Sequence, residues 1–216
     1  MLEHLRTSVL LVAMMAILTG FAFPLVVTGL ARAAFPLQST GSLVERDGEV
    51  VGSYLIGQGF AQPGYFHPRP SAAGSGGYDA GSSGGTNLAP TSAKLIEGIH
   101  KTLPSGEDDP GNFDGVKDLA AEYRQENGLA DTAPVPADAV TRSASGLDPH
   151  ISPANAELQV PRVARERGLA EVAVRDLVSR HTEARVAGIL GEPRVNVLRL
   201  NLALDGLAPD EPGTES

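Results

Sequence analysis

The chain has 216 residues, no cysteine and a formal net charge of −9 at pH 7. Its length suffices for one modest domain with an appendage. The negative charge argues against an electrostatic nucleic-acid binder, so no nucleic acid is expected among its partners. The absence of cysteine excludes disulfides and zinc or iron–sulfur centres held by cysteine.

The first predicted element is a membrane helix. Residues 7–31 carry no charge, and as an α-helix they would extend about 37 Å, against about 30 Å of bilayer hydrocarbon. Because a helix satisfies its own backbone hydrogen bonds in lipid, we predict a short flank at residues 1–6 and one transmembrane helix at 7–34. Pro24 is expected to kink this helix.

The two ends of this helix bear on cleavage and on orientation. A cleavable signal peptide is the alternative to an anchor, since residues 31–33 (ARA) resemble a cleavage site. The apolar stretch, however, exceeds the about 7–15 residues of a signal peptide's apolar region. The N-terminal flank carries His4 and Arg6 beside Glu3, and the opposite end carries Arg32. By about one charge, the positive-inside rule favours a cytoplasmic N-terminus and an extracytoplasmic soluble domain.

The soluble part, residues 35–205, opens with a predicted hairpin. Residues 41–60 contain two β-rich segments around Asp47-Gly48, a strong turn signal. Residues 61–90 are rich in glycine and proline, as in a flexible linker, yet they also contain aromatic residues. Because linkers rarely contain aromatic residues, we predict an ordered loop.

The middle of the soluble part is predicted to be helical and acidic. Helices are expected at residues 91–101 and at 116–128, with an exposed acidic loop at 104–116 between them. From residue 97 to residue 131 there are nine acidic and three basic residues. Such a segment usually forms a solvated face.

The last third contains a polar loop, SASGLDPHISP at 143–153, followed by helical and strand patterns. Ser152 and Pro153 form a helix-start signal, and Pro161 should kink that helix or divide it into two. An amphipathic helix is predicted at 169–185, and alternating leucines predict a strand at 194–205 that could join the sheet of the hairpin. An acidic, disordered tail is expected at 206–216. The predicted fold class is α+β: one N-terminal transmembrane helix followed by a single mixed soluble domain.

The polar loop has the residue types of a hydrolase, but not their arrangement. Ser143 or Ser145 with Asp148 and His150 could form a triad, yet catalytic triads are normally assembled from separated segments and a nucleophile-elbow motif is absent. The structural interpretation is a stiff loop, built by Gly146 and prolines, that docks against a partner.

Two further chemistries are weakly indicated. His67, His150 and Asp148 could bind a metal ion, but their spacing matches no known metal-site pattern. The glycines of GSSGGT at 81–86 resemble a phosphate-binding loop without its lysine, although backbone amides there could still bind an anion. No metal and no catalytic residue are therefore expected.

Several stretches together resemble one family. These are FPLVVTG, GSYLIGQGF, YFHPRPSAAG, SGGTNLAPTS, VPADAVTRSASGLDPHISPANAELQVPRVAR and GEPRVNVLRLNLALD. Through them the chain resembles the KdpC family, the small subunit of bacterial Kdp potassium-transporting P-type ATPases, from the anchor to about residue 205. The resemblance implies a single-pass subunit in the bacterial plasma membrane, without a catalytic centre, that assembles with a potassium-channel-like subunit and an ATP-hydrolysing subunit.

The family is also described as a catalytic chaperone that raises the ATP affinity of the ATP-hydrolysing subunit. The resemblance thus implies no firmly bound cofactor, with ATP at an interface with that subunit. Candidate residues for contacts with a partner or a nucleotide are Gln58, Arg69, Ser71, Asn87, Ser143, Gly146, Leu147, Asp148, His150, Gln159 and Arg162. For each of them the alternative is an internal role in capping, turn formation or a buried hydrogen bond.

The predicted orientation limits these roles. An extracytoplasmic domain would not meet cytoplasmic ATP, so the chaperone effect would pass through assembly or through the helix. Such a domain could instead lie over the potassium entrance, where its negative charge would raise the local cation concentration. A different class of function remains open, a membrane-anchored extracytoplasmic ligand-binding or docking module without a pump partner.

Overall fold

The computed structural model describes residues 2–46 and 48–207. The chain divides into two compact units, Met1–Ser53 and Tyr54–Ser216. Helices occur together with strands, and the strands form two small sheets, which confirms the α+β class. The predicted acidic tail lies mostly outside the described residues.

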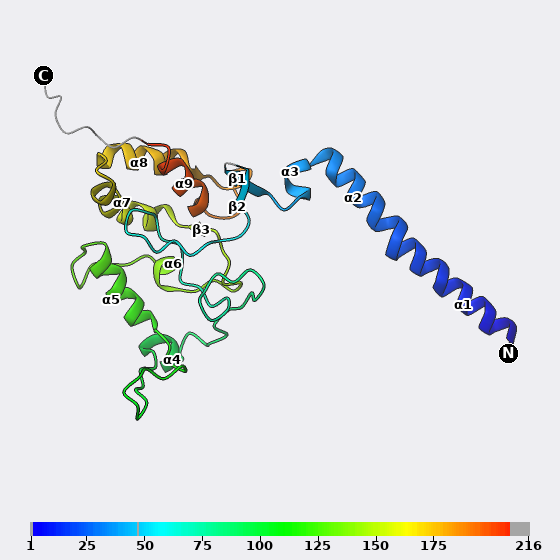
Figure 1. The fold of residues 1–216 in the computed structure, drawn as a ribbon, viewed down its shortest axis with the longest axis horizontal. Coiled ribbons are helices and arrows are strands. Elements are labelled where there is room, and N and C mark those ends of the chain that lie inside the picture. Colours follow the sequence, from blue (N-terminus) through cyan, green and yellow to red (C-terminus); the bar gives the residue numbers. More distant parts are fainter. Residues whose placement is uncertain (1, 47, 208–216) are drawn as a thin grey trace, which may run out of the picture. The chain divides into compact units, whose positions relative to one another are not determined.

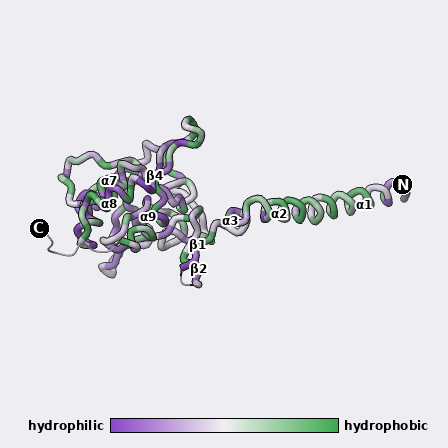
Figure 2. The backbone as a smooth tube through the Cα atoms, turned by 90° about the horizontal axis from the view of Figure 1, so that it is seen from above, coloured by the Kyte–Doolittle hydropathy of each residue, from purple (hydrophilic) through white to green (hydrophobic). Residues whose placement is uncertain are grey.

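The first unit begins with a long apolar helix. It consists of α1 (Leu2–Ile17), a π-helical turn η1 (Leu18–Ala22) and α2 (Phe23–Ala34). Figure 2 shows its predominantly hydrophobic colouring. Residues Glu3–Ala34 are long and apolar enough to cross a membrane, with a mean hydropathy of 2.5 in the most apolar window. The helix therefore fits a single-pass membrane protein.

The structure accommodates Pro24 by changing the hydrogen bonding of the turn before it. The N–H of Phe23 bonds to the carbonyl of Leu18, five residues earlier, as in a π-helix. Proline has no N–H to donate to the carbonyl four residues before it, so a regular α-helical ladder is interrupted here. A π-helical turn is one of the known ways in which helices absorb such an interruption.

The predicted hairpin is present but shorter than expected. After α3 (Pro36–Ser39), β1 (Leu43–Arg46) pairs antiparallel with β2 (Glu49–Ser53), with an irregularity after Val44. Gly48 has φ +84°, as the turn requires, while Asp47 lies outside the described residues. Residues 54–60, predicted to extend the second strand, are a turn and irregular backbone instead.

The second unit has its main core among three helices and one sheet. The helices are α7 (Pro153–Arg167), α8 (Glu171–Arg180) and α9 (Val197–Leu204), which lie together in Figure 1. The sheet has the order β3-β5-β4 and is antiparallel throughout. Its strands are β3 (His150–Ile151), β4 (Thr182–Glu183) and β5 (Arg194–Asn196). The core they enclose includes Phe66, Ile151, Val160, Val163, Val174, Val195 and Leu200.

A smaller core lies under α5 (Val116–Glu126) and α6 (Ala137–Val140), around Tyr123, Ala139 and Val140. The predicted helix at 116–128 is thus confirmed. The helix predicted at 91–101 shortens to α4 (Ala93–Glu97), because Gly98 at φ +81° ends it and Ile99 pairs with Phe113.

The helix-start signal at Ser152 is confirmed. The Ser152 side chain accepts a hydrogen bond from the N–H of Asn155 at 3.1 Å, and Gly168 ends α7 in the left-handed conformation. Pro161 neither ends nor divides α7, and it lies exposed on the outer face of the helix. The helix predicted at 169–185 ends at Arg180, because Thr182 and Glu183 pair with β5.

The strand predicted at 194–205 is wrong after its third residue. The side chain of Asn196 accepts a hydrogen bond from the N–H of Arg199, and helix α9 begins there. The buried residues Val197, Leu200, Asn201 and Leu204 follow a helical repeat, which the leucine alternation concealed. The prediction of one shared sheet is also wrong, because β1 and β2 form their own two-stranded sheet.

The segment that contains Phe66 and His67 crosses the core without belonging to a strand. Asn201 of α9 accepts from the N–H of Phe66 at 2.9 Å and donates to its carbonyl at 3.0 Å. Gln159 of α7 does the same for His67, at 2.7 and 3.1 Å. Two buried amide side chains thus replace the hydrogen bonds of neighbouring strands.

We predict that Asn201→Ala destabilises the fold. The exchange leaves the N–H and the carbonyl of buried Phe66 without partners, so the free energy of unfolding should fall by about 1–3 kcal/mol for each group. Urea unfolding of the detergent-solubilised chain, followed by tyrosine fluorescence, measures this. Gln125→Ala, at an exposed position of α5, is the control and should change stability by less than about 0.5 kcal/mol. Equal stability of the two variants would contradict the assigned role of Asn201.

Candidate functional site

The polar loop at residues 143–150 is fixed by backbone hydrogen bonds to three distant segments. The carbonyls of Ser145, Leu147 and Pro149 accept from the N–H groups of Gly84, Gly57 and Val197, at 2.9, 2.8 and 2.9 Å. The loop is therefore an ordered part of the domain and not a free linker.

Gly146 and Ser71 allow the loop to approach the glycine-rich segment closely. Gly146 has φ +67°, and a Cβ atom there would lie 2.6 Å from the carbonyl oxygen of Gly84. The hydroxyl of Ser71 donates to the carbonyl of Gly146 at 2.6 Å and accepts from the N–H of Ala73 and of Tyr78. The requirement for glycine at position 146 is thus both conformational and steric.

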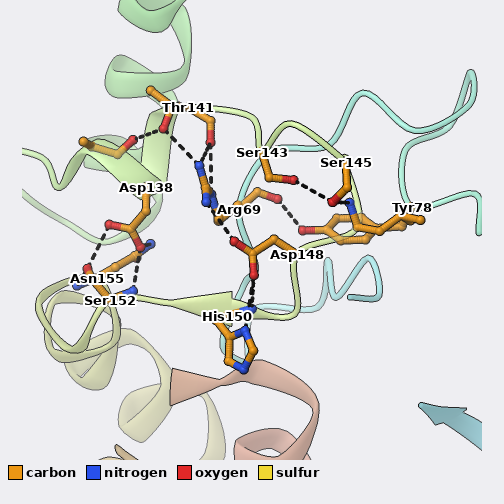
Figure 3. A network of polar contacts seen from close by, with 12 residues as sticks. Arg69, Tyr78, Asp138, Thr141, Ser143, Ser145, Asp148, His150, Ser152 and Asn155 are labelled. Atoms are coloured by element: carbon orange, nitrogen blue, oxygen red, sulfur yellow. Dashed lines mark hydrogen bonds and ion pairs between the residues drawn. The ribbon is translucent and has the colours of Figure 1, made fainter. Parts of the chain in front are cut away.

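Arg69, Asp148 and His150 form the centre of the site (Figure 3). Arg69 Nη1 donates to Asp148 Oδ2 at 2.8 Å, while Asp148 Oδ1 accepts from the backbone N–H of His150 at 3.0 Å and lies 3.3 Å from its Nδ1. Burial alone would raise the pKa of Asp148, but the hydrogen bonds from His150 and Arg69 outweigh it and lower the pKa to about 2. Asp148 is therefore a fixed carboxylate at neutral pH, unsuited to accept a proton.

Further hydrogen bonds hold Arg69 in place. Its guanidinium donates to the carbonyl of Thr141 at 3.3 Å, and its own carbonyl accepts from the Tyr78 hydroxyl at 2.5 Å. Burial is the main cause that raises the pKa of Tyr78, so its hydroxyl remains a donor. Beside this group, Asp138 accepts from the N–H and hydroxyl of Ser152 at 2.7 and 2.8 Å (Figure 3).

Two clefts flank the ion pair of Arg69 and Asp148, and both residues line each of them. One, of about 580 Å³, also contains His150, Glu192 and Arg194. The other, of about 640 Å³, is more apolar, with Leu55, Ile56, Leu147 and Pro149. The loop therefore presents a rigid surface with a charged centre and an apolar side.

The structure brings together only part of the partner- or nucleotide-contact residues predicted from the sequence. Arg69 and Ser71 bond to the polar loop. The loop itself contains Ser143, Gly146, Leu147, Asp148 and His150. Gln58 is half-buried and follows Gly57, which bonds to Leu147. Asn87 is exposed, with a left-handed backbone at φ +52°.

Gln159 and Arg162 lie in the core and not at this surface. Arg162 is 2% exposed and donates to Asn127 at 3.0 Å, to Gln159 at 2.8 Å and to the backbone carbonyls of Pro63 and Tyr65. Burial lowers the pKa of Arg162, while the charge of Glu126 opposes this shift and the neutral acceptors solvate the guanidinium. Both residues thus have the internal role that the sequence left as an alternative.

The arrangement does not form a catalytic triad. Ser143 and Ser145 lie hydroxyl to hydroxyl at 3.4 Å, and the Ser145 hydroxyl accepts from the N–H of Leu147. Among the described residues, no hydrogen bond joins either hydroxyl to His150. A nucleophile and base in contact, which serine catalysis requires, are therefore missing from this loop.

The weaker chemical hypotheses are not supported either. His67 pairs with Glu126 at 2.7 Å while His150 pairs with Asp148, so they do not form one metal site. Within the described residues, the only group with metal-site spacing is His100, Asp114 and Asp118. Asp118 there already caps α5 by accepting from the N–H of Gly115 at 2.8 Å, which lowers its pKa. In the phosphate-like loop the amides of Gly81 and Gly84 already bond to Asp79 and Ser145.

Four residues important for this geometry were not predicted from the sequence. Tyr78 and Thr141 position Arg69, Asp138 holds the start of α7, and Asn201 fixes Phe66. Of these only Tyr78 gave a signal, as an aromatic residue within a glycine-rich stretch. The others have partners that local patterns do not reveal.

We predict that the stabilising effect of Asp148 depends on pH. Its folded pKa is lowered to about 2, so its contribution is present above the unfolded value of about 3.9 and is lost as the pH falls through the folded value. The difference in unfolding free energy between the native chain and Asp148→Asn should therefore be largest near pH 6 and shrink below about pH 4. Denaturant titrations across this range measure it, and a difference independent of pH would refute the assignment. Asp131→Asn, at an exposed position, is the control, with little effect expected at pH 6.

Comparison with known proteins confirms the resemblance drawn from the motifs. The family model "KdpC: K+-transporting ATPase, c chain" matches residues 5–206. The potassium-transporting ATPase KdpC subunit of Koribacter versatilis is 49% identical over 209 residues, covering 97% of each chain. That of Gemmatimonas aurantiaca is 49% identical over 216 residues, 100% of this chain and 99% of the relative. That of Sorangium cellulosum is 52% identical over 206 residues, 95% and 99%. The chain therefore belongs to the KdpC family, the c chain of the K+-transporting ATPase.

Proposed function

We propose that this chain is a non-catalytic subunit that assembles with a potassium-channel-like subunit and an ATP-hydrolysing subunit, and that it raises the ATP affinity of the latter. The observation that carries this proposal is the match over residues 5–206 to a family of ATPase subunits. In the site, the polar groups of the loop form hydrogen bonds that position one another. Such an arrangement suits recognition by shape and charge better than catalysis.

The surface around Leu147 is the part of the site best suited to docking. The cleft beside it, of about 640 Å³, combines apolar side chains with the ion pair of Arg69 and Asp148. An apolar patch with a fixed charged group is a common anchor for a protein partner. Because the loop is already ordered, docking would require little additional loss of conformational entropy.

The charges flanking the membrane helix support an extracytoplasmic domain. In that orientation the domain does not meet cytoplasmic ATP, so its effect on ATP affinity would be transmitted through the assembled complex. Its net charge of −9 would also attract cations near a potassium entrance, in a salt-dependent way. A stand-alone ligand-binding module is less well supported, because the relatives are named as ATPase subunits.

Orientation can be measured because the chain has no native cysteine. We predict that Ser82→Cys, at an exposed position of the glycine-rich loop, is labelled in intact cells by a membrane-impermeant thiol reagent. The control His4→Cys, on the opposite flank, should be labelled only after lysis. The reverse pattern would place the domain inside the cell and make a shared nucleotide site the better explanation of the ATP effect.

Docking can be tested with Leu147→Ser. This variant should co-purify with less of the two large subunits, and the complex that remains should show a higher KM for ATP. Val172→Ser is the matched control, because Val172 is 72% exposed on α8, away from the loop. Normal recovery and a normal KM for Leu147→Ser would show that this surface does not dock.

A further inference from the structure

A separate apolar surface lies at the turn between β4 and β5. Val186, Ile189 and Leu190 are 58%, 75% and 62% exposed. They are close in sequence and belong to neither core of the second unit. Single exposed apolar residues are normal, but three on one turn require an explanation. These three residues are called the apolar tip below.

The apolar tip is held in one conformation. Val186 and Leu190 exchange two backbone hydrogen bonds, of 2.9 and 3.0 Å. Ala187 at φ +52° and Gly188 at φ +77° turn the chain between them, and an ion pair of 2.6 Å joins Arg185 to Glu192 below. A left-handed conformation is unfavourable for alanine, so the surrounding bonds maintain it. The side chains are thus presented to the solvent by an ordered turn.

We propose that the apolar tip inserts into the interfacial region of a bilayer that contains anionic lipids. The chain has an apolar helix that fits a membrane anchor, and such an anchor raises the effective concentration of a lipid surface for the domain tethered to it. Three aliphatic side chains are few for an independent protein interface, which typically buries about 800 Å² on each partner. A lipid interface, in contrast, accepts apolar side chains without a complementary pocket.

The charges around the tip favour the same occupant. Residues 180–199 contain four arginines and two glutamates, whereas the whole chain has 26 acidic and 17 basic residues. The side chains of Arg180, Arg185 and Arg199 are 72%, 45% and 47% exposed, and they form ion pairs with Asp176, Glu192 and Glu183 that leave part of each guanidinium open to the solvent. A basic region with an apolar end matches anionic headgroups above hydrocarbon. In an otherwise acidic domain, this region can approach an anionic membrane with the least repulsion.

The experiment places a fluorescent probe on the tip of the full-length chain in vesicles. Ala187→Cys carries an environment-sensitive dye, and Ser82→Cys with the same dye is the reference. In vesicles containing phosphatidylglycerol, spin-labelled lipid should quench the Ala187 probe and aqueous iodide should not. The Ser82 probe should respond in the opposite way. Equal accessibility of both probes to iodide would overturn the proposal.

Two variants separate insertion by the tip from insertion by the dye. The double variant Ile189→Ser, Leu190→Ser removes apolar surface that is already solvent-exposed, so the fold should be retained while most lipid quenching is lost. Val172→Ser is the matched control and should leave the quenching unchanged. If quenching persists in the double variant, the dye and not the tip inserts, and the proposal fails.

The last measurement repeats the quenching experiment in the assembled ATPase. If the Ala187 probe becomes shielded from iodide only when the two large subunits are present, and lipid does not quench it, the tip docks on protein and the lipid proposal is wrong. Quenching by lipid both with and without these subunits supports it. Vesicles of neutral phosphatidylcholine should give less quenching, because they offer the arginines no anionic headgroups.

Discussion

The second unit depends on one constraint: an irregular chain crosses its core, and every buried backbone group of that chain needs a partner. In a sheet, neighbouring strands would supply those partners. Here the side-chain amides of Gln159 and Asn201 supply them to His67 and Phe66, and Arg162 supplies them to Pro63 and Tyr65. Buried polar residues, which are costly in isolation, thereby become the means of attaching the loop to the helices.

The site depends on the same kind of contact, in which side chains bond to distant backbone and hold irregular segments in place. Arg69 lies two residues after His67, which these amides fix, so its backbone position relative to α7 does not depend on Asp148 alone. Asp148 in turn is fixed by the bonds of its own loop to Gly57, Gly84 and Val197. The ion pair of Arg69 and Asp148 at 2.8 Å therefore joins two segments 79 residues apart. A disturbance of the core amides would be expected to displace the ion pair and the loop around it as well.

Local sequence patterns were sufficient to predict those features of the fold that depend only on neighbouring residues. The cap at Ser152 and the end of α5 near Gly128 follow from short-range hydrogen bonds and glycine conformation, and both were predicted. The strand predicted over α9 failed because alternating leucines fit a strand pattern, while the buried Asn201 that reveals the helical face reads as polar. The attachment of Phe66 spans 135 residues, so no local pattern could indicate it. The loop at 143–150 was identified as a stiff polar element, but its partners Ser71 and Gly84 come from a stretch with the composition of a linker.

The chemistry of the site argues for a role based on rigidity. Asp148 is held ionised by its neighbours, Tyr78 is held neutral by burial, and the serine hydroxyls of the loop bond to one another or to backbone. A general acid or base needs a pKa near the working pH and a free face toward a substrate. Asp148 and Tyr78 are instead held so that neither changes protonation near neutral pH, which keeps their contacts with Arg69 constant. Fixed contacts of this kind suit the docking role proposed for the loop, because a surface that is already ordered loses little conformational entropy when a partner binds.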